Sequence, residues 1–235
     1  RIINGDMRID QRNAGASVTP GDGQYITDRW IARISQASKF SAQQNAGAVT
    51  PPVGFTNYLG ATSLSAYSIG TNDLFGFEQR IEGFNCSDLG WGTANAQSVT
   101  LSFQVRSSIT GTFGGSILNG DASPRSYPFA YTINSANTWE TKTITIPGDT
   151  SGTWFTTNGV GISIWFGMGM GSTYSGTAGT WASASYLSAT GATSVVGTNG
   201  ATFYITGVQL EAGTVATPFE RRPYGTELAL CQRYY

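Results

Sequence analysis

The stretch from Phe203 to Glu211, FYITGVQLE, decides the fold. It is apolar, rich in residues that favour β-structure, and ends on a carboxylate, after which the chain leaves through the proline-containing segment Thr217 to Pro223, TPFERRP. This pattern predicts the last strand of a β-sandwich, with the exit segment packed back over it. The rest of the chain is interpreted outward from this closing strand.

Alternation of apolar and polar residues recurs from Tyr25 to Glu211, separated by clusters of Gly, Ser, Asn, Asp and Pro. In the run from Val99 to Arg106, the apolar side chains share one face and the polar ones the other, as in a half-buried strand. Similar strands are expected in the following runs: Ile26 to Ile34, Leu59 to Ile69, Phe75 to Phe84, Tyr127 to Ile133, Trp139 to Ile146, Val160 to Met168 and Thr202 to Glu211. The fold class is therefore all-β, an antiparallel β-sandwich of jelly-roll (galactose-binding-like) type with a short C-terminal helix.

Two stretches read as helical. Leu89 to Gln97 is expected to hold a short turn of helix, and Glu227 to Tyr235 places Leu228, Cys231 and Tyr235 three and four residues apart, on one apolar side. That side needs a partner, which is either the helix's own domain or copies of itself about a symmetry axis.

The domain prediction is a single sandwich over residues 1–223 and a C-terminal helical segment over residues 224–235, continuing or packing at an oligomer axis. The segment from Gly167 to Gly200 is too polar and too rich in glycine for a central strand, so it is expected to form a long loop pair at one end of the sandwich.

Composition limits the partners. The net charge is −1 and only 11% of residues are charged, so there is no basic footprint for nucleic acid or for an anionic membrane. No apolar run is long enough to span a membrane, and any anchor or targeting segment upstream of Arg1 would fall outside this numbering. The two cysteines, Cys86 and Cys231, lack zinc-site spacing and are expected to be free, buried thiols.

The chain contains no histidine, which excludes Ser-His-Asp, Cys-His and zinc-dependent hydrolysis of the usual kinds. A carboxylate pair for glycoside hydrolysis remains open, with Glu78 and Glu82 flanking Arg80 on one strand face. The simpler interpretation of these three residues is a solvated charge ladder, so we expect no enzyme activity.

Both ends of the chain carry a recognisable pattern. The opening segment Asn4 to Arg12 reads NGDMRIDQR, and the closing segments read GVQLE, TPFE and LALCQRYY. This pattern resembles a family of bacteriophage tail-fibre and virion structural proteins. The resemblance implies a jelly roll similar to the carbohydrate-binding modules attached to glycanases, set in a virion appendage that touches the host surface. It also implies that several residues fasten the chain ends and do not bind ligand: Gln11, Arg12, Glu211, Glu220, Arg221 and Arg222.

The related carbohydrate-binding jelly rolls often hold a structural calcium between the opening segment and an acid in the closing strand. Asp6 matches the first part, but Thr206 stands where those modules commonly have Asp. Calcium needs six to eight oxygen ligands, so we expect no cofactor, with calcium at Asp6 as the alternative.

Aromatic side chains are the candidate glycan-binding groups, because sugar rings stack on Trp and Tyr. Trp165 lies on the polar face of its strand beside Gly161, Ser163 and Gly167, where it forms a stacking platform or is covered by the following loop or by a neighbouring subunit. Gln104 and Arg106 would add hydrogen bonds if their face adjoins Trp165.

Three further candidates lie in glycine-rich loops, where a ligand can approach: Trp91, Tyr174 and Trp181. Each has packing within the protein as its alternative, and Trp154, at a strand entry, is expected to be structural.

The function predicted from sequence is that of a virion structural protein, a tail-fibre or appendage component that contributes to attachment to a host-surface glycan. The expected partners are its own copies, as a homotrimer, other virion proteins and the glycan. The alternatives are a purely structural decoration or adaptor protein of the capsid or tail, and a glycan hydrolase.

Overall fold

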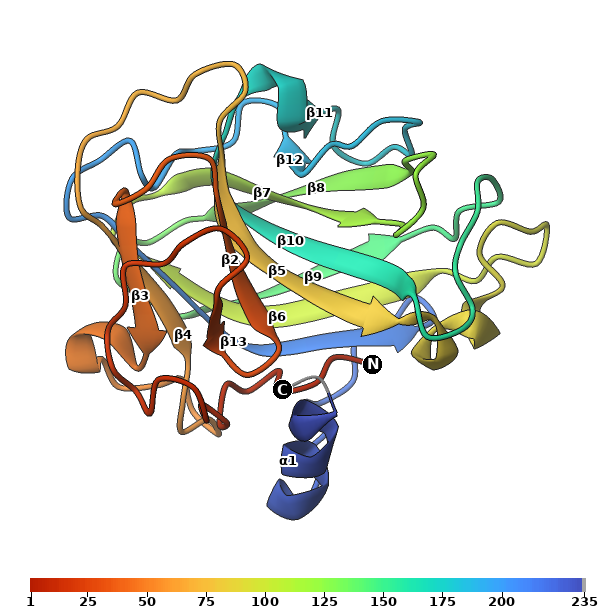
Figure 1. Cartoon of the computed structure of the whole chain (residues 1–235), viewed down its shortest axis with the longest axis horizontal. Coiled ribbons are helices and arrows are strands. Elements are labelled where there is room, and N and C mark those ends of the chain that lie inside the picture. Colours follow the sequence, from red (N-terminus) through yellow and green to blue (C-terminus); the bar gives the residue numbers. More distant parts are fainter. Residues whose placement is uncertain (234–235) are drawn as a thin grey trace.

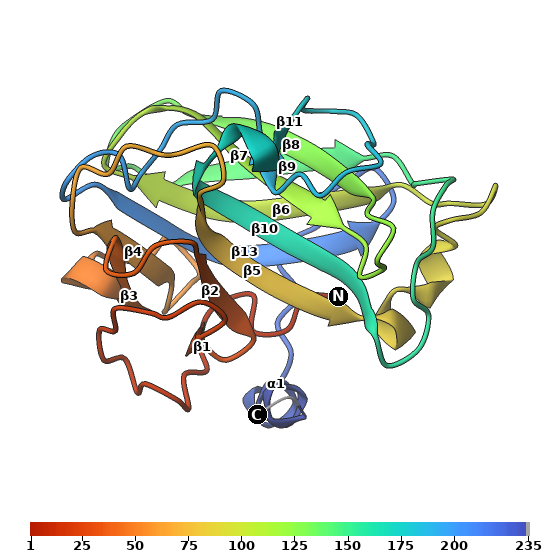
Figure 2. The ribbon, with the colours of Figure 1, turned by 45° about the horizontal axis from the view of Figure 1, so that its top comes forward.

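The structure is a computed structural model that describes residues 1–233, and it consists mainly of two antiparallel β-sheets packed face to face (Figures 1 and 2). The six-stranded sheet has the order β1-β2-β5-β10-β7-β8. Its strands are β1 (Tyr25–Thr27), β2 (Trp30–Ile34), β5 (Leu74–Glu82), β10 (Val160–Met170), β7 (Gly111–Leu118) and β8 (Ser126–Ile133). The five-stranded sheet consists of β3 (Phe40–Gln44), β4 (Leu59–Ser63), β13 (Thr202–Ala212), β6 (Val99–Ser107) and β9 (Glu140–Ile146), in that order.

The connectivity is that of a jelly roll. Strands β4 to β10 and β13 interleave so that β4-β13-β6-β9 form one sheet and β5-β10-β7-β8 the other. This is the strand order of two Greek keys folded into a double sheet. The predicted all-β, jelly-roll class is confirmed, and β1 to β3 extend it along one side.

The closing strand β13 lies in the interior of the five-stranded sheet, between β4 and β6. Its inward side chains Phe203, Ile205, Val208 and Leu210 are buried in the core. The pairing with β6 shifts between Thr206 and Gln209, which is why the inward residues change from odd to even numbers. The exit segment packs back over this strand as predicted, with the Glu220 N–H donating to the side-chain oxygen of Gln209 at 2.7 Å.

Most strand predictions hold, with several differences. The run expected over Leu59 to Ile69 is a strand only in β4, up to Ser63. The run from Ile26 to Ile34 is broken at Arg29, whose φ of 73° ends β1 before β2 begins. Two strands of the main sheets, β3 and the glycine-rich β7, were not predicted. The helix expected over Leu89 to Gln97 is wrong: the short 3₁₀ turns η2 (Gly83–Asn85) and η3 (Ser87–Leu89) end at its first residue, and turns and irregular chain follow.

The segment after β10 lies flat on the outer face of the six-stranded sheet, not at the end of the sandwich as predicted. It contains η4 (Ser172–Tyr174) and the short parallel pair β11 (Ser175–Gly176) and β12 (Ser188–Ala189), and β12 contacts β7, β8 and β10. Glycines make this approach possible: a Cβ on Gly114 would lie 2.3 Å from the Ser188 hydroxyl oxygen, and one on Gly167 would lie 2.9 Å from it. The loop is therefore seated closely on the sheet.

The C-terminal helix α1 (Tyr224–Gln232) lies outside the two sheets, beside the start of the chain (Figure 1). Cys231 is buried in a small cluster with Ile3 and Ile9, and Glu227 accepts hydrogen bonds from the Asn4 backbone and from Arg222. Part of the predicted apolar side of this helix is thus covered by the chain's own opening segment, while Tyr235 lies outside the described residues. Another helix, η1 (Ala46–Ala48), is a single 3₁₀ turn.

Within residues 1–233, none of the helices combines the length and the apolar character that crossing a membrane requires. Both cysteines are free and buried, as predicted.

Candidate functional site

A groove of about 490 Å³ lies on the outer face of the six-stranded sheet. Its floor is formed by two neighbouring strands, because Glu78 and Arg80 of β5 pair with Trp165 and Ser163 of β10. The loop after β10 builds one wall with Tyr174 and Leu187, and the loop after β7 adds Asp121. The groove thus combines an aromatic wall with a charged floor.

Glu78 is the centre of the floor. Its side chain is only 4% exposed, yet the carboxylate is fully partnered: Oε1 accepts from Arg80 Nε at 2.9 Å and Ser163 Oγ at 2.6 Å, and Oε2 accepts from Arg33 Nη1 at 2.7 Å and Arg80 Nη2 at 3.3 Å. Trp165 Nε1 donates to Ser163 Oγ at 2.9 Å and so joins the network. A buried charge is stable only when it is paired and hydrogen-bonded in this way.

Arg33 connects the floor to the surface. Burial lowers the pKa of Arg33, but the nearby carboxylates of Glu78 and Asp22 outweigh this effect and raise the pKa above its usual value. Its guanidinium therefore stays charged, and it lies 5.1 Å from the centre of the Trp165 ring.

The predicted charge ladder of Glu78, Arg80 and Glu82 is correct in that Arg80 pairs with Glu78. It is wrong in that the two carboxylates are buried and not solvated. Glu78 and Glu82 are 3% and 7% exposed, and only Arg80 reaches solvent. Glu82 accepts from Arg233, beyond the end of α1, at 2.7 Å. These two carboxylates hold the guanidinium groups of arginine side chains in place.

Trp165 is 5% exposed. Leu118 and Leu187 pack against it, and Arg33 covers part of its ring face. The indole N–H of Trp165 already donates to Ser163, so this side chain supports the groove floor. Contact between Trp165 and a sugar stays a prediction, and it requires the sugar to stack on the part of the ring that Arg33 leaves uncovered. Tyr174 is half-buried: it lines the groove and packs against the cluster of Leu118, Trp165 and Leu187.

Trp91 and Trp181 lie together elsewhere, in a cluster with Trp154. We call these three residues the tryptophan cluster. The Trp91 ring lies 4.6 Å from that of Trp154 and 5.4 Å from that of Trp181, all edge to face. Each indole N–H donates to a backbone carbonyl, of Gln97, Ser151 and Pro147 for Trp91, Trp154 and Trp181 respectively. Trp91 is buried, whereas Trp181 is half-buried and packs on Tyr127.

Gln104 and Arg106 lie on the outer face of β6, in the other sheet, so the structure does not bring them to Trp165. Gln104 Nε2 donates to Thr141 Oγ1 at 2.8 Å, and Arg106 donates to the Asn137 carbonyl at 2.9 Å while lying over the Tyr204 ring. Their role in binding a glycan stays a prediction, separate from the groove.

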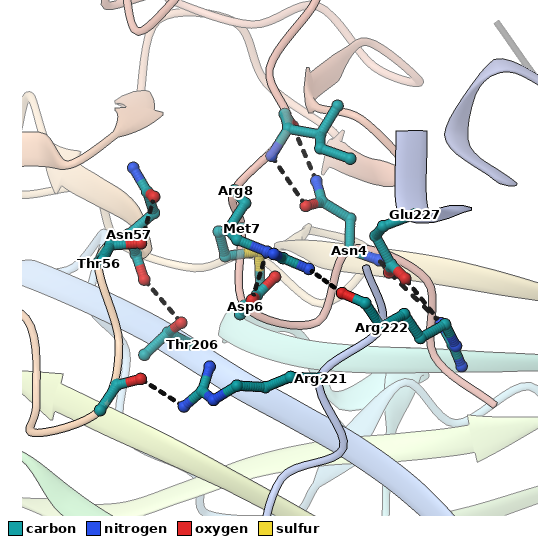
Figure 3. Close-up of polar contacts among 12 residues, drawn as sticks. Asn4, Asp6, Met7, Arg8, Thr56, Asn57, Thr206, Arg221, Arg222 and Glu227 are labelled. Carbon is teal, nitrogen blue, oxygen red and sulfur yellow. Dashed lines mark hydrogen bonds and ion pairs between the residues drawn. The ribbon is translucent and has the colours of Figure 1, made fainter. Parts of the chain in front are cut away.

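The junction of the chain ends tests the calcium alternative (Figure 3). The buried carboxylate of Asp6 pairs with Arg8 Nε at 2.7 Å, and the Thr206 hydroxyl donates to the Asn57 carbonyl at 2.7 Å. No group of three or more His, Cys, Asp or Glu side chains able to hold a metal occurs among residues 1–233. A guanidinium already lies beside the carboxylate that calcium would need, which argues against a calcium ion there. The expectation of no cofactor, with calcium at Asp6 as the alternative, stays a prediction.

Other residues of the terminal motifs also make fastening contacts. Arg222 donates to the Ile2 carbonyl at 3.0 Å and pairs with Glu227, while Arg221 lies over the rings of Phe55 and Phe219. Glu211 accepts from the Thr217 N–H at 3.1 Å. These side-chain contacts join the two ends of the chain.

Sequence reasoning missed Arg33 and Asp121 as groove residues. Arg33 sits at an outward position of β2, which its alternation with Ala32 indicates, but that pattern does not reveal that β2 pairs with β5. Asp121 follows β7, a strand that was not predicted. The missing signal in both cases is strand pairing between distant segments.

Comparison with known proteins gives no match to a protein-family model and no sequence match to a curated protein. Solved structures with a similar fold include the carbohydrate-binding module CBM4, at 16% identity over 91% of this chain and 100% of that one, with a TM-score of 0.46. A family 11 carbohydrate-binding module from a cellulosomal cellulase of Clostridium thermocellum matches at 13% identity over 87% of this chain and 99% of that one, with a TM-score of 0.43. The enzymatically active domain of bacteriophage CBA120 tailspike protein 4 matches at 14% identity over 83% of this chain and 21% of that one, with a TM-score of 0.47. These likenesses concern the fold alone.

Proposed function

We propose that this protein is a non-enzymatic glycan-binding component of a virion appendage, such as a tail fibre, and that the groove beside Tyr174 is its binding site. The observation that carries the proposal is the groove itself, about 490 Å³ in volume, with a half-buried tyrosine lining its wall and charged hydrogen-bond donors on its floor. Sugar sites combine these two features, because the ring stacks on the sugar face while polar groups bind the hydroxyls. The resemblance of both chain ends to virion structural proteins supports the location.

Weak single-site binding suits a protein that acts in several copies. We propose a homotrimer, in which linked sites raise the effective concentration and give avidity that one shallow groove lacks. No structural calcium belongs to this proposal, because Arg8 pairs with Asp6. If no calcium binds, the midpoint of thermal unfolding should be the same in calcium and in EDTA. A higher midpoint in calcium would contradict this expectation.

The test is a glycan array probed with the purified protein, followed by titration of the best ligand. Tyr174→Ala is expected to weaken binding about tenfold, since one stacking contact contributes on the order of 1–1.5 kcal/mol. Tyr224→Ala is the matched control, because Tyr224 is exposed on α1 and away from the groove. Equal binding by the two variants, or no binding to any glycan, would refute the proposal.

The second candidate is a purely structural decoration or adaptor protein. The burial of Trp165 and the satisfied N–H groups of the tryptophan cluster favour it, since these aromatic residues serve packing within the chain. Particles assembled with Tyr174→Ala distinguish the two functions: normal assembly with lost adsorption favours attachment, and failed assembly favours the adaptor.

A further inference from the structure

The guanidinium groups of Arg33 and Arg80 are partly exposed in the groove, whereas the carboxylate of Glu78 is buried below them. The side chain of Arg80 is 48% exposed and that of Arg33 is 22% exposed, whereas that of Glu78 is 4% exposed. A molecule that enters the groove therefore meets guanidinium N–H groups before it meets Glu78.

Glu78 has no accepting capacity left for a ligand. A carboxylate offers about four acceptor positions, and Glu78 uses them for Arg33, for Ser163 and twice for Arg80. Arg80 donates only two of the five N–H groups of a guanidinium to Glu78. The floor thus offers donors in excess of acceptors.

The donors are also held in position. Arg80 is fixed by its forked contact with Glu78, and Arg33 is fixed between Glu78, Asp22 and the Trp165 ring. A guanidinium that is already ordered loses less side-chain entropy when it binds a ligand.

One group on the groove wall opposes an anion. Asp121 is half-buried on the loop after β7, where its Oδ1 accepts from the Ser123 N–H at 2.8 Å. Its carboxylate would repel a negatively charged ligand while Arg80 attracts it. This opposition gives the test two variants with expected effects of opposite sign.

We infer that the glycan bound in this groove carries a carboxylate, as uronic acids do, and that this carboxylate pairs with Arg80, with Arg33 contributing a second donor. The inference rests on the proposed function of the groove. A planar guanidinium binds a carboxylate through two parallel hydrogen bonds, which a neutral sugar hydroxyl cannot reproduce.

The test is calorimetric titration of the full chain with oligogalacturonate and with its carboxyl-reduced counterpart. The acidic probe is expected to bind about tenfold more tightly, as one charge-assisted hydrogen bond predicts. Arg80→Gln should remove this preference, Arg80→Lys should keep part of it, and Asp121→Asn should increase affinity for the acidic probe.

Lys142→Gln is the matched control, since it removes a positive charge from β9 in the other sheet and should leave both affinities unchanged. Thermal unfolding of each variant confirms that the fold persists. Equal affinity for the two probes, or equal effects of Arg80→Gln and Asp121→Asn, would overturn the acidic-ligand inference while the groove remained a glycan site. Absence of binding to every glycan, acidic or neutral, would instead remove the proposed function.

Discussion

The tryptophan cluster and the groove are two aromatic regions that differ in where their indole N–H groups are directed. In the cluster, all three indoles donate to backbone carbonyls and pack edge to face on one another. In the groove, Trp165 donates to Ser163, which donates in turn to the buried Glu78. The bonds of Trp91 and Trp154 brace their own loops, and that of Trp181 links two segments distant in sequence. The Trp165 bond instead belongs to a network of charged side chains at the surface of the groove. The first arrangement serves stability and the second can serve recognition.

Removing Trp154 should have the largest effect. It is 9% exposed and contacts both other rings of the cluster, so Trp154→Ala is expected to lower the free energy of unfolding by about 3–5 kcal/mol. Denaturant unfolding measures this change. Tyr174→Ala, made in the groove wall, should cost far less, and comparable losses in the two variants would remove the contrast between the regions.

The wall of the groove depends on a close contact between a strand and the loop above it. In Gly114→Ala the new Cβ would lie 2.3 Å from Ser188 Oγ and 2.8 Å from the Ala189 nitrogen, so the loop must move. We expect a loss of about 1–3 kcal/mol in the free energy of unfolding together with weaker glycan binding. Gly21→Ala is the control, since a Cβ there meets no atom within 4 Å. Binding that survives in Gly114→Ala would show that the loop position does not shape the site.

Local patterns predicted the fold better than the site. The apolar, β-rich run FYITGVQLE identified β13, and the alternation around Trp165 placed its indole on the outward face beside Ser163, as observed. The partners above Trp165 could not be predicted, because Arg33 and Leu187 come from distant segments that only tertiary packing brings together. The glycine content of the segment after β10 indicated a loop. It did not indicate that this loop packs closely on Gly114 of β7.

The same applies to the aromatic candidates. Glycine neighbours made Trp91 and Trp181 resemble ligand-binding residues, and nothing in the sequence reveals that both contact Trp154. The positions were predicted correctly as loops, while the packing between loops was not.

A matched pair of conservative changes sharpens the comparison further. Trp165→Phe keeps the ring beneath Arg33 and removes the N–H that Ser163 accepts, while Ser163 still donates to Glu78. The expected loss of stability is about 1 kcal/mol, the contribution of one buried hydrogen bond. Glycan affinity should fall by a few fold, because Ser163 and Glu78 hold Arg80 in place. Calorimetric titration gives the affinity, and an unchanged value would separate Trp165 from the binding network.

Trp181→Phe makes the same chemical change in the cluster, and it should have the smallest effect. The bond lost is the 2.9 Å contact from Trp181 Nε1 to the Pro147 carbonyl, which lies in an exposed setting where water can replace the donor. We expect a loss of about 0.5 kcal/mol in the free energy of unfolding and no change in glycan affinity. Denaturant unfolding and the same titration provide both values. If affinity instead falls several-fold at unchanged stability, Trp181 touches the ligand, and the tryptophan cluster is part of the recognition surface because its half-buried member reaches solvent beside Tyr127.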